Sequence, residues 1–226
     1  SYEDRPVTEQ FSRAAPEVMW WPWRAALFKT LYRNDGTYAK PGVHRPRAPD
    51  PDRLAAARWF DGHGRALDPR YRRRGLFSPY GRPNYGLAQL NHYPLGAMES
   101  FVLKAARGRA VHAEDRLGLD YWVERNYCTE EDRSIAALAP AAQAVRRRLA
   151  ADPELARRHA AAVDWRRERF AALMLEEPCR ALMGRLLVTP PSRPVPREVA
   201  AQLVAHARRA QAQPRGGTGA TDPSAP

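Results

Sequence analysis

The sequence predicts an α/β protein in which short strands and loops come first and a helical C-terminal extension follows. Two observations predict this class. Up to about Gly86, short apolar stretches alternate with segments rich in Pro, Gly and Asp, a pattern typical of strands joined by turns. From residue 96 onward, apolar residues recur at helical spacing, and beyond Ala141 prolines separate successive segments of this kind.

Two strand signals and one turn signal stand out in the first part. Residues 25–33, "AALFKTLYR", predict a short strand that ends at the turn Asn34-Asp35-Gly36. Between Lys40 and Gly86 only "ARWFDG" and "GLFS" predict strands, and the aspartates of "PDPD" predict a turn. So long a loop-rich stretch is typical of a region that covers a binding site.

The helical part begins with residues 96–107, for which Gly108 supplies a C-terminal stop. In "TEEDRSIAALA" we expect Thr129 to be the N-cap of a helix with Asp132 in its first turn. The clearest predicted helix spans Glu154 to Glu177. The apolar faces of the first and last of these helices consist of Met98, Phe101, Val102 and Ala105, and of Val163, Phe170, Leu173 and Met174.

These signals divide the chain into four parts. Residues 1–138 form the α/β part and residues 139–191 the helical extension. Residues 192–211 are a proline linker followed by a short helix from Glu198 to Gln211. Residues 212–226 have the composition of a disordered tail.

Composition and charge narrow the class of partner. The chain has 226 residues, 44% of them hydrophobic, and a formal charge of +12, which favours anionic partners such as nucleic acid, phosphates, nucleotide sugars or lipid headgroups. An Arg-rich, Ala-rich composition with 21 prolines is equally typical of a high-GC genome. The two cysteines form no CxxC pair, and no apolar run approaches the roughly 20 residues of a membrane span. We therefore predict a cytoplasmic protein.

The residues alone offer only partial sites. His92 precedes a predicted helix, where an imidazole reaches a metal ion or a phosphate, although a lone histidine is more often structural. His44, on a loop, has the same standing, and Glu9 is a candidate base that is more often a solvated side chain. The basic runs "YRRRG" and "VRRRL" predict solvated faces, so no specific nucleic-acid partner is expected.

One passage carries a family resemblance. Residues 91–112, "NHYPLGAMESFVLKAARGRAVH", followed by "DYWVERNYCTEEDRSI", resemble the C-terminal half of bacterial family 2 glycosyltransferases, in the subgroup similar to family 92. Gly96 and Ala97 replace the family's usual Lys-Ser pair. The segments "VTEQF", "FKTLYR" and "GVHRPR" are also similar, so the resemblance covers residues 1–138 and extends more loosely over the helical part to about residue 191. The positions that match the motif are His92, Tyr93, Glu99, Phe101, Lys104, Arg107 and Gly108.

The resemblance implies a GT-A fold for residues 1–138, a nucleotide-sugar donor, a divalent metal ion (Mn²⁺ or Mg²⁺) and a carbohydrate or lipid-linked acceptor. In such enzymes the metal neutralises the diphosphate leaving group while a carboxylate deprotonates the acceptor hydroxyl. His92 then corresponds to the histidine at the metal or diphosphate, and Glu9 becomes the candidate base. The implied substrate-binding residues are Tyr93, Lys104, Arg107 and His44.

The resemblance also implies a missing part. The half that holds the nucleotide base and the Asp-x-Asp metal motif is expected before Ser1, so we expect this chain to be inactive alone. Two other readings stay open: a noncatalytic basic module that binds an anionic polymer or a protein partner, and a helical interaction domain over residues 141–211. A lipid-linked acceptor would add peripheral contact with the inner face of a membrane.

Overall fold

The structure is a computed structural model that describes residues 5–21, 26–79, 81–108 and 117–212. Within this part the chain combines helices with two small antiparallel sheets, which confirms the mixed α/β class. The chain divides into two compact units, Ser1–Pro194 and Val195–Pro226. Except for Ala212, the predicted tail lies outside the described residues.

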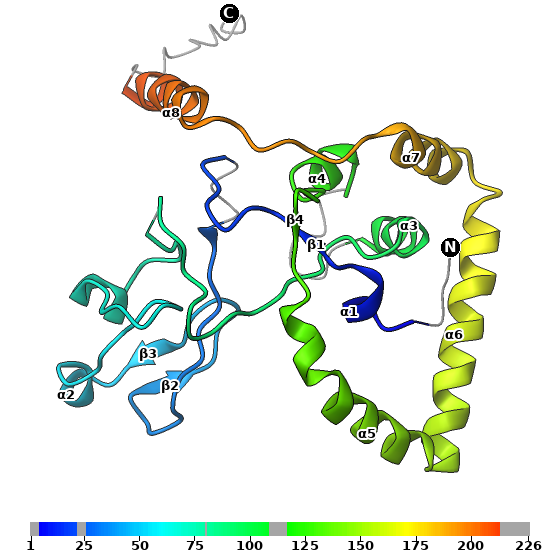
Figure 1. Cartoon of the computed structure of the whole chain (residues 1–226), viewed down its shortest axis with the longest axis horizontal. Coiled ribbons are helices and arrows are strands. Elements are labelled where there is room, and N and C mark those ends of the chain that lie inside the picture. Colours follow the sequence, from blue (N-terminus) through cyan, green and yellow to red (C-terminus); the bar gives the residue numbers. More distant parts are fainter. Residues whose placement is uncertain (1–4, 22–25, 80, 109–116, 213–226) are drawn as a thin grey trace, which may run out of the picture. The chain divides into compact units, whose positions relative to one another are not determined.

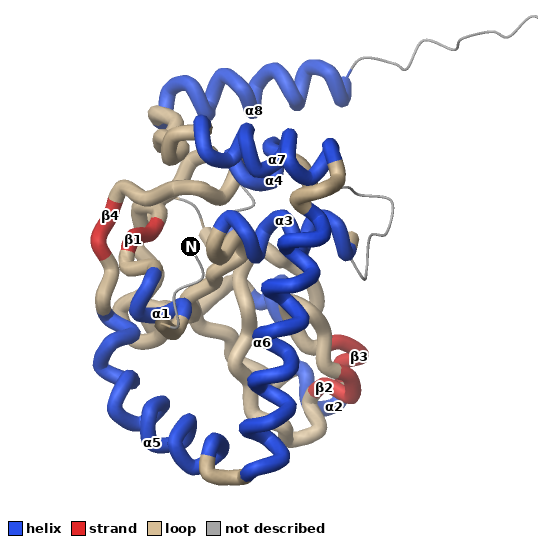
Figure 2. Tube along the Cα trace, turned by 90° about the vertical axis from the view of Figure 1, so that its right-hand side faces the viewer, coloured by secondary structure: helices blue, strands red, loops and turns tan. Residues whose placement is uncertain are grey.

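A helical core organises the first unit. Helix α3 (Met98–Arg107) packs against α6 (Pro153–Leu173) and α7 (Glu177–Val188), and α7 also packs against α4 (Leu119–Val123) (Figure 1 and Figure 2). The predicted helix 96–107 and its stop are thus confirmed, since Gly108 ends α3 with φ +79°. The buried side chains of this core are Phe101, Val102, Leu103, Leu117, Trp122, Leu173 and Leu186.

The helix expected to start at Thr129 is not formed; the chain is extended there instead. Residues Glu130–Glu131 form strand β4, which pairs antiparallel with β1 (Arg13–Ala14) and is therefore held extended. The Asp132 carboxylate accepts a hydrogen bond from the Ser134 backbone N–H at 2.9 Å. Asp132 therefore starts a turn after the strand, and Thr129 caps no helix.

A 3₁₀ helix and two α-helices follow this turn. A 3₁₀ helix (Ser134–Leu138) leads into α5 (Ala139–Ala150), and α5 packs against α6. The helix expected from Glu154 to Glu177 is confirmed as α6, although α6 already ends at Leu173. Helix α7 then begins at Glu177, and Pro178 stands in its first turn, where its missing N–H needs no partner. The predicted inner face of α6 is correct at Leu173, which is buried.

The other sheet lies in the loop-rich region. Strand β2 (Tyr38–Lys40) pairs antiparallel with β3 (Arg47–Pro49), and the short helix α2 (Pro51–Leu54) follows directly. The Asp50 carboxylate accepts hydrogen bonds from the backbone N–H groups of Asp52 and Arg53, so Asp50 is the N-cap of a short helix where the sequence predicted a turn. The predicted turn before β2 is also present, with Gly36 at φ +84°.

Isolated bridges, which join Leu27 to Phe77 and Phe60 to Ala66, stand in place of the strands predicted at 25–33 (described from residue 26), 57–62 and 75–78. Their aromatic side chains form a cluster rather than a ladder: the Phe28 ring centre lies 6.3 Å from that of Trp59 and 6.1 Å from that of Tyr71. Residues 88–97, where a strand was expected to end at His92, are irregular. His92 therefore sits on a loop.

The second unit contains α8 (Arg197–Ala212), which confirms the short helix predicted from Glu198 to Gln211. The proline linker is irregular from residue 189 to 196 apart from a bridge at Ser192, as its prolines predict. No described helix has the length and apolar character that crossing a membrane requires.

Candidate functional site

The loop that carries His92 and Tyr93 is anchored to α3 by Lys104. The Lys104 ammonium donates to the Pro94 carbonyl at 2.7 Å and lies 3.4 Å from the Tyr121 hydroxyl. It also lies 4.8 Å from the centre of the Tyr121 ring, within cation–π range. The side chain is half-buried, so its position is set by these contacts before any ligand arrives.

Arg125 approaches the same tyrosine. Its guanidinium lies 3.7 Å from the Tyr121 ring centre and donates to the Tyr121 carbonyl at 3.2 Å. A second contact, 3.1 Å to Glu124, holds it further. Tyr121 thus positions two cations, one from α3 and one from just beyond α4.

His44 comes from the loop between β2 and β3. Its Nδ1 lies 2.9 Å from the Phe28 carbonyl, which only accepts, so Nδ1 carries the hydrogen. Thr30 and Lys29 fix the same loop by donating to the carbonyls of His44 (2.9 Å) and Val43 (2.5 Å). The Nε2 atom of His44 is therefore left as the ring nitrogen that is available for a ligand.

These groups act together on His92. Partial loss of hydration lowers the pKa of His92 from its ordinary value, and the positive charges of Lys104, Lys29, Arg125 and His44 lower it further. We call these five residues the His92 cluster. His92 itself is exposed, and positive charge from four separate segments of the chain acts on it, a setting that attracts anions.

The predicted metal role of His92 fits this setting less well than the predicted diphosphate role. Among the described residues, no three His, Cys, Asp or Glu side chains come together to hold a metal ion. The groups that act on His92 are cations, which suit phosphate oxygens and repel a divalent ion. The Mn²⁺ or Mg²⁺ that the resemblance implies stays a prediction.

The structure brings together three of the predicted site residues, His44, His92 and Lys104. Tyr93 lies next to them and is half-buried, with its hydroxyl 3.4 Å from the Asn91 amide nitrogen. Arg107, in the last turn of α3, and Glu9, on the four-residue helix α1 (Val7–Gln10), are both exposed. Their roles remain predictions.

Two members of the cluster escaped sequence reasoning. Lys29 belongs to "FKTLYR", which was interpreted as an apolar strand, so its lysine was not considered a site residue. Arg125 lies four residues after Tyr121, which on a helix is the spacing of facing side chains and was the available signal.

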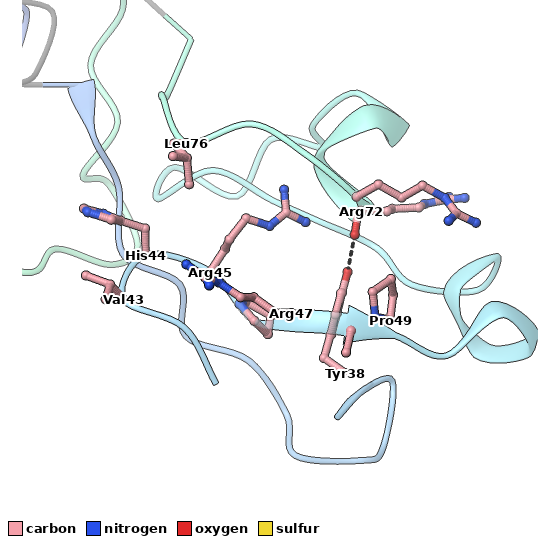
Figure 3. A pocket seen from close by; sticks show the side chains of 11 residues that line it. Tyr38, Val43, His44, Arg45, Arg47, Pro49, Arg72 and Leu76 are labelled. Atoms are coloured by element: carbon pink, nitrogen blue, oxygen red, sulfur yellow. Dashed lines mark hydrogen bonds between the residues drawn. The ribbon is translucent and has the colours of Figure 1, made fainter. Parts of the chain in front are cut away.

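A pocket lined by arginines lies beside His44. Its volume is about 300 Å³, and its lining includes Tyr38, His44 and four arginines: Arg45, Arg47, Arg72 and Arg73 (Figure 3). We call it the arginine pocket. The basic run at 71–75 is therefore more than a solvated face, because Arg72 is half-buried and lines this pocket with Arg73.

The charge of Lys104 gives a direct test of the cluster. We expect Lys104→Met to raise the pKa of His92, because it removes the positive charge that most strongly disfavours the protonated ring. A titration of the His92 ring by NMR measures this pKa. Arg107→Met removes one positive charge from the next turn of the same helix and should leave the pKa of His92 close to that of the wild type. Equal shifts in both variants would contradict the proposed proximity of Lys104.

No model of a known protein family matches the chain, and neither does any curated protein or solved structure. Function therefore has to be inferred from the chemistry of the His92 cluster and the arginine pocket.

Proposed function

We propose that the chain forms the diphosphate-binding side of a glycosyltransferase, and that the His92 cluster binds the diphosphate of a nucleotide-sugar donor. The observation that carries this proposal is the pair of cations held around Tyr121: Lys104, which also anchors the loop that carries His92, and Arg125. The resemblance of residues 91–112 to family 2 glycosyltransferases supports it and suggests a carbohydrate or lipid-linked acceptor. A GT-A arrangement of residues 1–138 belongs to the same proposal.

The cluster is suited to a leaving diphosphate because its cations are held in place. Lys104 and Arg125 are fixed around Tyr121, so little reorganisation is needed when negative charge develops on the bridging oxygen. An arriving anion raises the pKa of His92, which then takes up a proton and donates a hydrogen bond to a phosphate oxygen. Glu9 remains the candidate base for the acceptor hydroxyl.

A divalent ion, when bound, would neutralise part of the diphosphate charge. The described residues offer no ligand set for it, and the roles of Lys104, Arg125 and His92 do not depend on it.

Calorimetric titration tests the proposal. We expect UDP to bind more tightly than uridine, since only UDP carries the diphosphate. We expect His92→Gln to weaken UDP binding roughly tenfold, the loss of one charge-assisted hydrogen bond. Proton uptake on binding, measured in two buffers of different ionisation enthalpy, should be smaller in His92→Gln than in the wild type.

Arg185→Gln is the matched control, because Arg185 is exposed on α7 and lies outside the cluster. It should bind UDP like the wild type. Equal affinity for UDP and uridine, or unchanged UDP binding by His92→Gln, would refute the diphosphate role.

The alternative function is a noncatalytic module that binds an anionic polymer. The exposed arginines Arg146, Arg147 and Arg148 on α5 favour it. Binding of this kind weakens steeply with salt and does not select UDP over other anions. Titrations of UDP and of polyphosphate at two salt concentrations therefore separate the two functions.

A further inference from the structure

We infer that the arginine pocket binds the anionic group of a saccharide, either a carboxylate or a phosphate. The anionic part of this inference comes from the pocket itself. The saccharide part rests on the proposed glycosyltransferase function, in which the pocket would receive an acidic acceptor next to the donor diphosphate.

The charge of the pocket is uncompensated. Four arginines and His44 contribute to its lining, and none of its eleven lining residues is Asp or Glu. Arg47, Arg72 and Arg73 form no side-chain hydrogen bond or ion pair with any other residue that the structure describes. Grouped cations repel one another, so an anion that enters the pocket relieves this repulsion and gains charge-assisted hydrogen bonds.

One wall of the pocket is rigid. Arg45 donates to the carbonyls of Tyr71 at 2.7 Å and Gly75 at 3.3 Å, and its guanidinium lies 4.9 Å from the centre of the Trp59 ring. Figure 3 shows Arg45 between His44 and Arg72. Arg45 is thus occupied by the fold, and the other three arginines are left for a ligand.

Tyr38, another lining residue, is also fixed. The Tyr38 hydroxyl donates to the Arg72 carbonyl at 2.9 Å (Figure 3) and accepts a hydrogen bond from the Trp59 indole at 2.9 Å. Ala48, another lining residue, has φ +52°, a left-handed conformation that non-glycine residues seldom adopt and that concentrates at binding sites. A preformed pocket binds with less loss of conformational entropy.

The size and place of the pocket set the class of ligand. A volume of about 300 Å³ lies at the lower limit for small-molecule sites and suits a single sugar-sized group. His44 lines the pocket and its charge also acts on His92, so the pocket adjoins the His92 cluster. A saccharide seated there would therefore lie close to the proposed donor diphosphate.

Calorimetric titration with three probes tests this inference. Trigalacturonate carries carboxylates, glucose 1,6-bisphosphate carries phosphates, and maltotriose is neutral. We expect at least one anionic probe to bind and maltotriose not to bind. The anionic probe that binds more tightly identifies the group that the pocket prefers.

The double variant Arg72→Gln/Arg73→Gln should weaken binding of that probe by roughly tenfold or more, as expected when charge-assisted hydrogen bonds are lost. Arg47 lines the pocket from β3, so Arg47→Gln should also weaken binding of that probe. This single variant serves as the test if the double variant does not fold. Arg74→Gln removes an exposed neighbouring charge that does not line the pocket and should bind like the wild type.

No binding of either anionic probe, or equal losses in Arg74→Gln and in the pocket variants, would overturn the inference. His92→Gln separates it from the proposed function. If His92→Gln leaves UDP binding unchanged while the arginine variants lose binding of the anionic probe, the saccharide role of the pocket is supported and the donor role of His92 is refuted. If His92→Gln weakens UDP binding while the arginine variants still bind the anionic probe, the pocket role is refuted and the donor role of His92 is supported.

Discussion

Replacement of Phe101 by Ala is expected to lower the free energy of unfolding by about 3–5 kcal/mol, the usual loss when a fully buried Phe is truncated. Phe101 has 0% of its surface exposed. Its ring lies edge-to-face with Trp122 at 5.1 Å between centres and 6.1 Å from Tyr121. The variant therefore removes apolar burial and two aromatic contacts and leaves a cavity between α3 and α4.

Chemical denaturation followed by far-ultraviolet circular dichroism measures this loss. Leu175→Ala is the control, because Leu175 is 82% exposed just beyond α6 and its truncation should change stability by no more than about 0.5 kcal/mol. Similar stabilities for the two variants would contradict the helical core. Phe101 stands one turn before Lys104, so the Phe101 variant should also weaken UDP binding if the His92 cluster depends on α3.

The helix α3 could be predicted because its signals are local. An apolar face at 3.6-residue spacing and a glycine at the end are both properties of a dozen consecutive residues. The end of α6 was predicted less well: the predicted helix stops at Glu177, just before Pro178, whereas α6 ends at Leu173 and Glu177 already belongs to α7. Periodicity alone does not show where a helix ends.

The failed strands have a different cause. Phe28, Trp59 and Phe77 have high strand propensity, but the Phe28 ring packs against both Trp59 and Tyr71 across the loop region, and no sheet lines these residues up. Thr129 has the right residue type for an N-cap, yet pairing of the next two residues with Arg13–Ala14 decides their conformation. In each case a contact distant in sequence outweighs a local preference.

The candidate site also combines residues that the sequence indicated with residues that only the fold brings to them. His92 and Lys104 were marked by the resemblance, and twelve residues of loop and helix bring them together. Lys29 and Arg125 join them only through tertiary structure, and the arginines of the pocket come from β3, its preceding loop and the run at 71–75. Residue type indicated which side chains could bind an anion, but not which of them lie together.

Asp61 is expected to be the largest single contributor to the stability of the loop-rich region. Its side chain is only 1% exposed and lies 2.8 Å from Arg65 and 3.3 Å from Arg82. It also accepts hydrogen bonds from the backbone N–H groups of His63 at 3.0 Å and Arg65 at 2.9 Å. We expect Asp61→Ala to lower the free energy of unfolding by about 2–4 kcal/mol, because several hydrogen bonds to one buried charge are lost together.

Asp61→Asn separates the charge of this side chain from its shape. The amide oxygen still accepts from the two backbone N–H groups, so the loss should be smaller than in Asp61→Ala. Asp68→Asn is the control, since Asp68 is exposed and accepts from one backbone N–H, that of Arg70 at 2.8 Å. Asp68→Asn should lower the free energy of unfolding by no more than about 1 kcal/mol.

The charge of Asp61 predicts a pH dependence with a definite sign. Burial alone would raise the pKa of Asp61, but hydrogen bonds from the Arg65 backbone, the Arg65 side chain and the His63 backbone, with the charge of Arg65, lower it overall. A carboxyl with a lower pKa in the folded state contributes stability above its unfolded pKa of about 4 and loses that contribution as the pH falls through the folded value. The stability difference between the wild type and Asp61→Asn should therefore be constant near neutral pH and shrink at acidic pH. A difference that stays constant down to the acid limit would mean that the shape of Asp61, and not its charge, holds the loop.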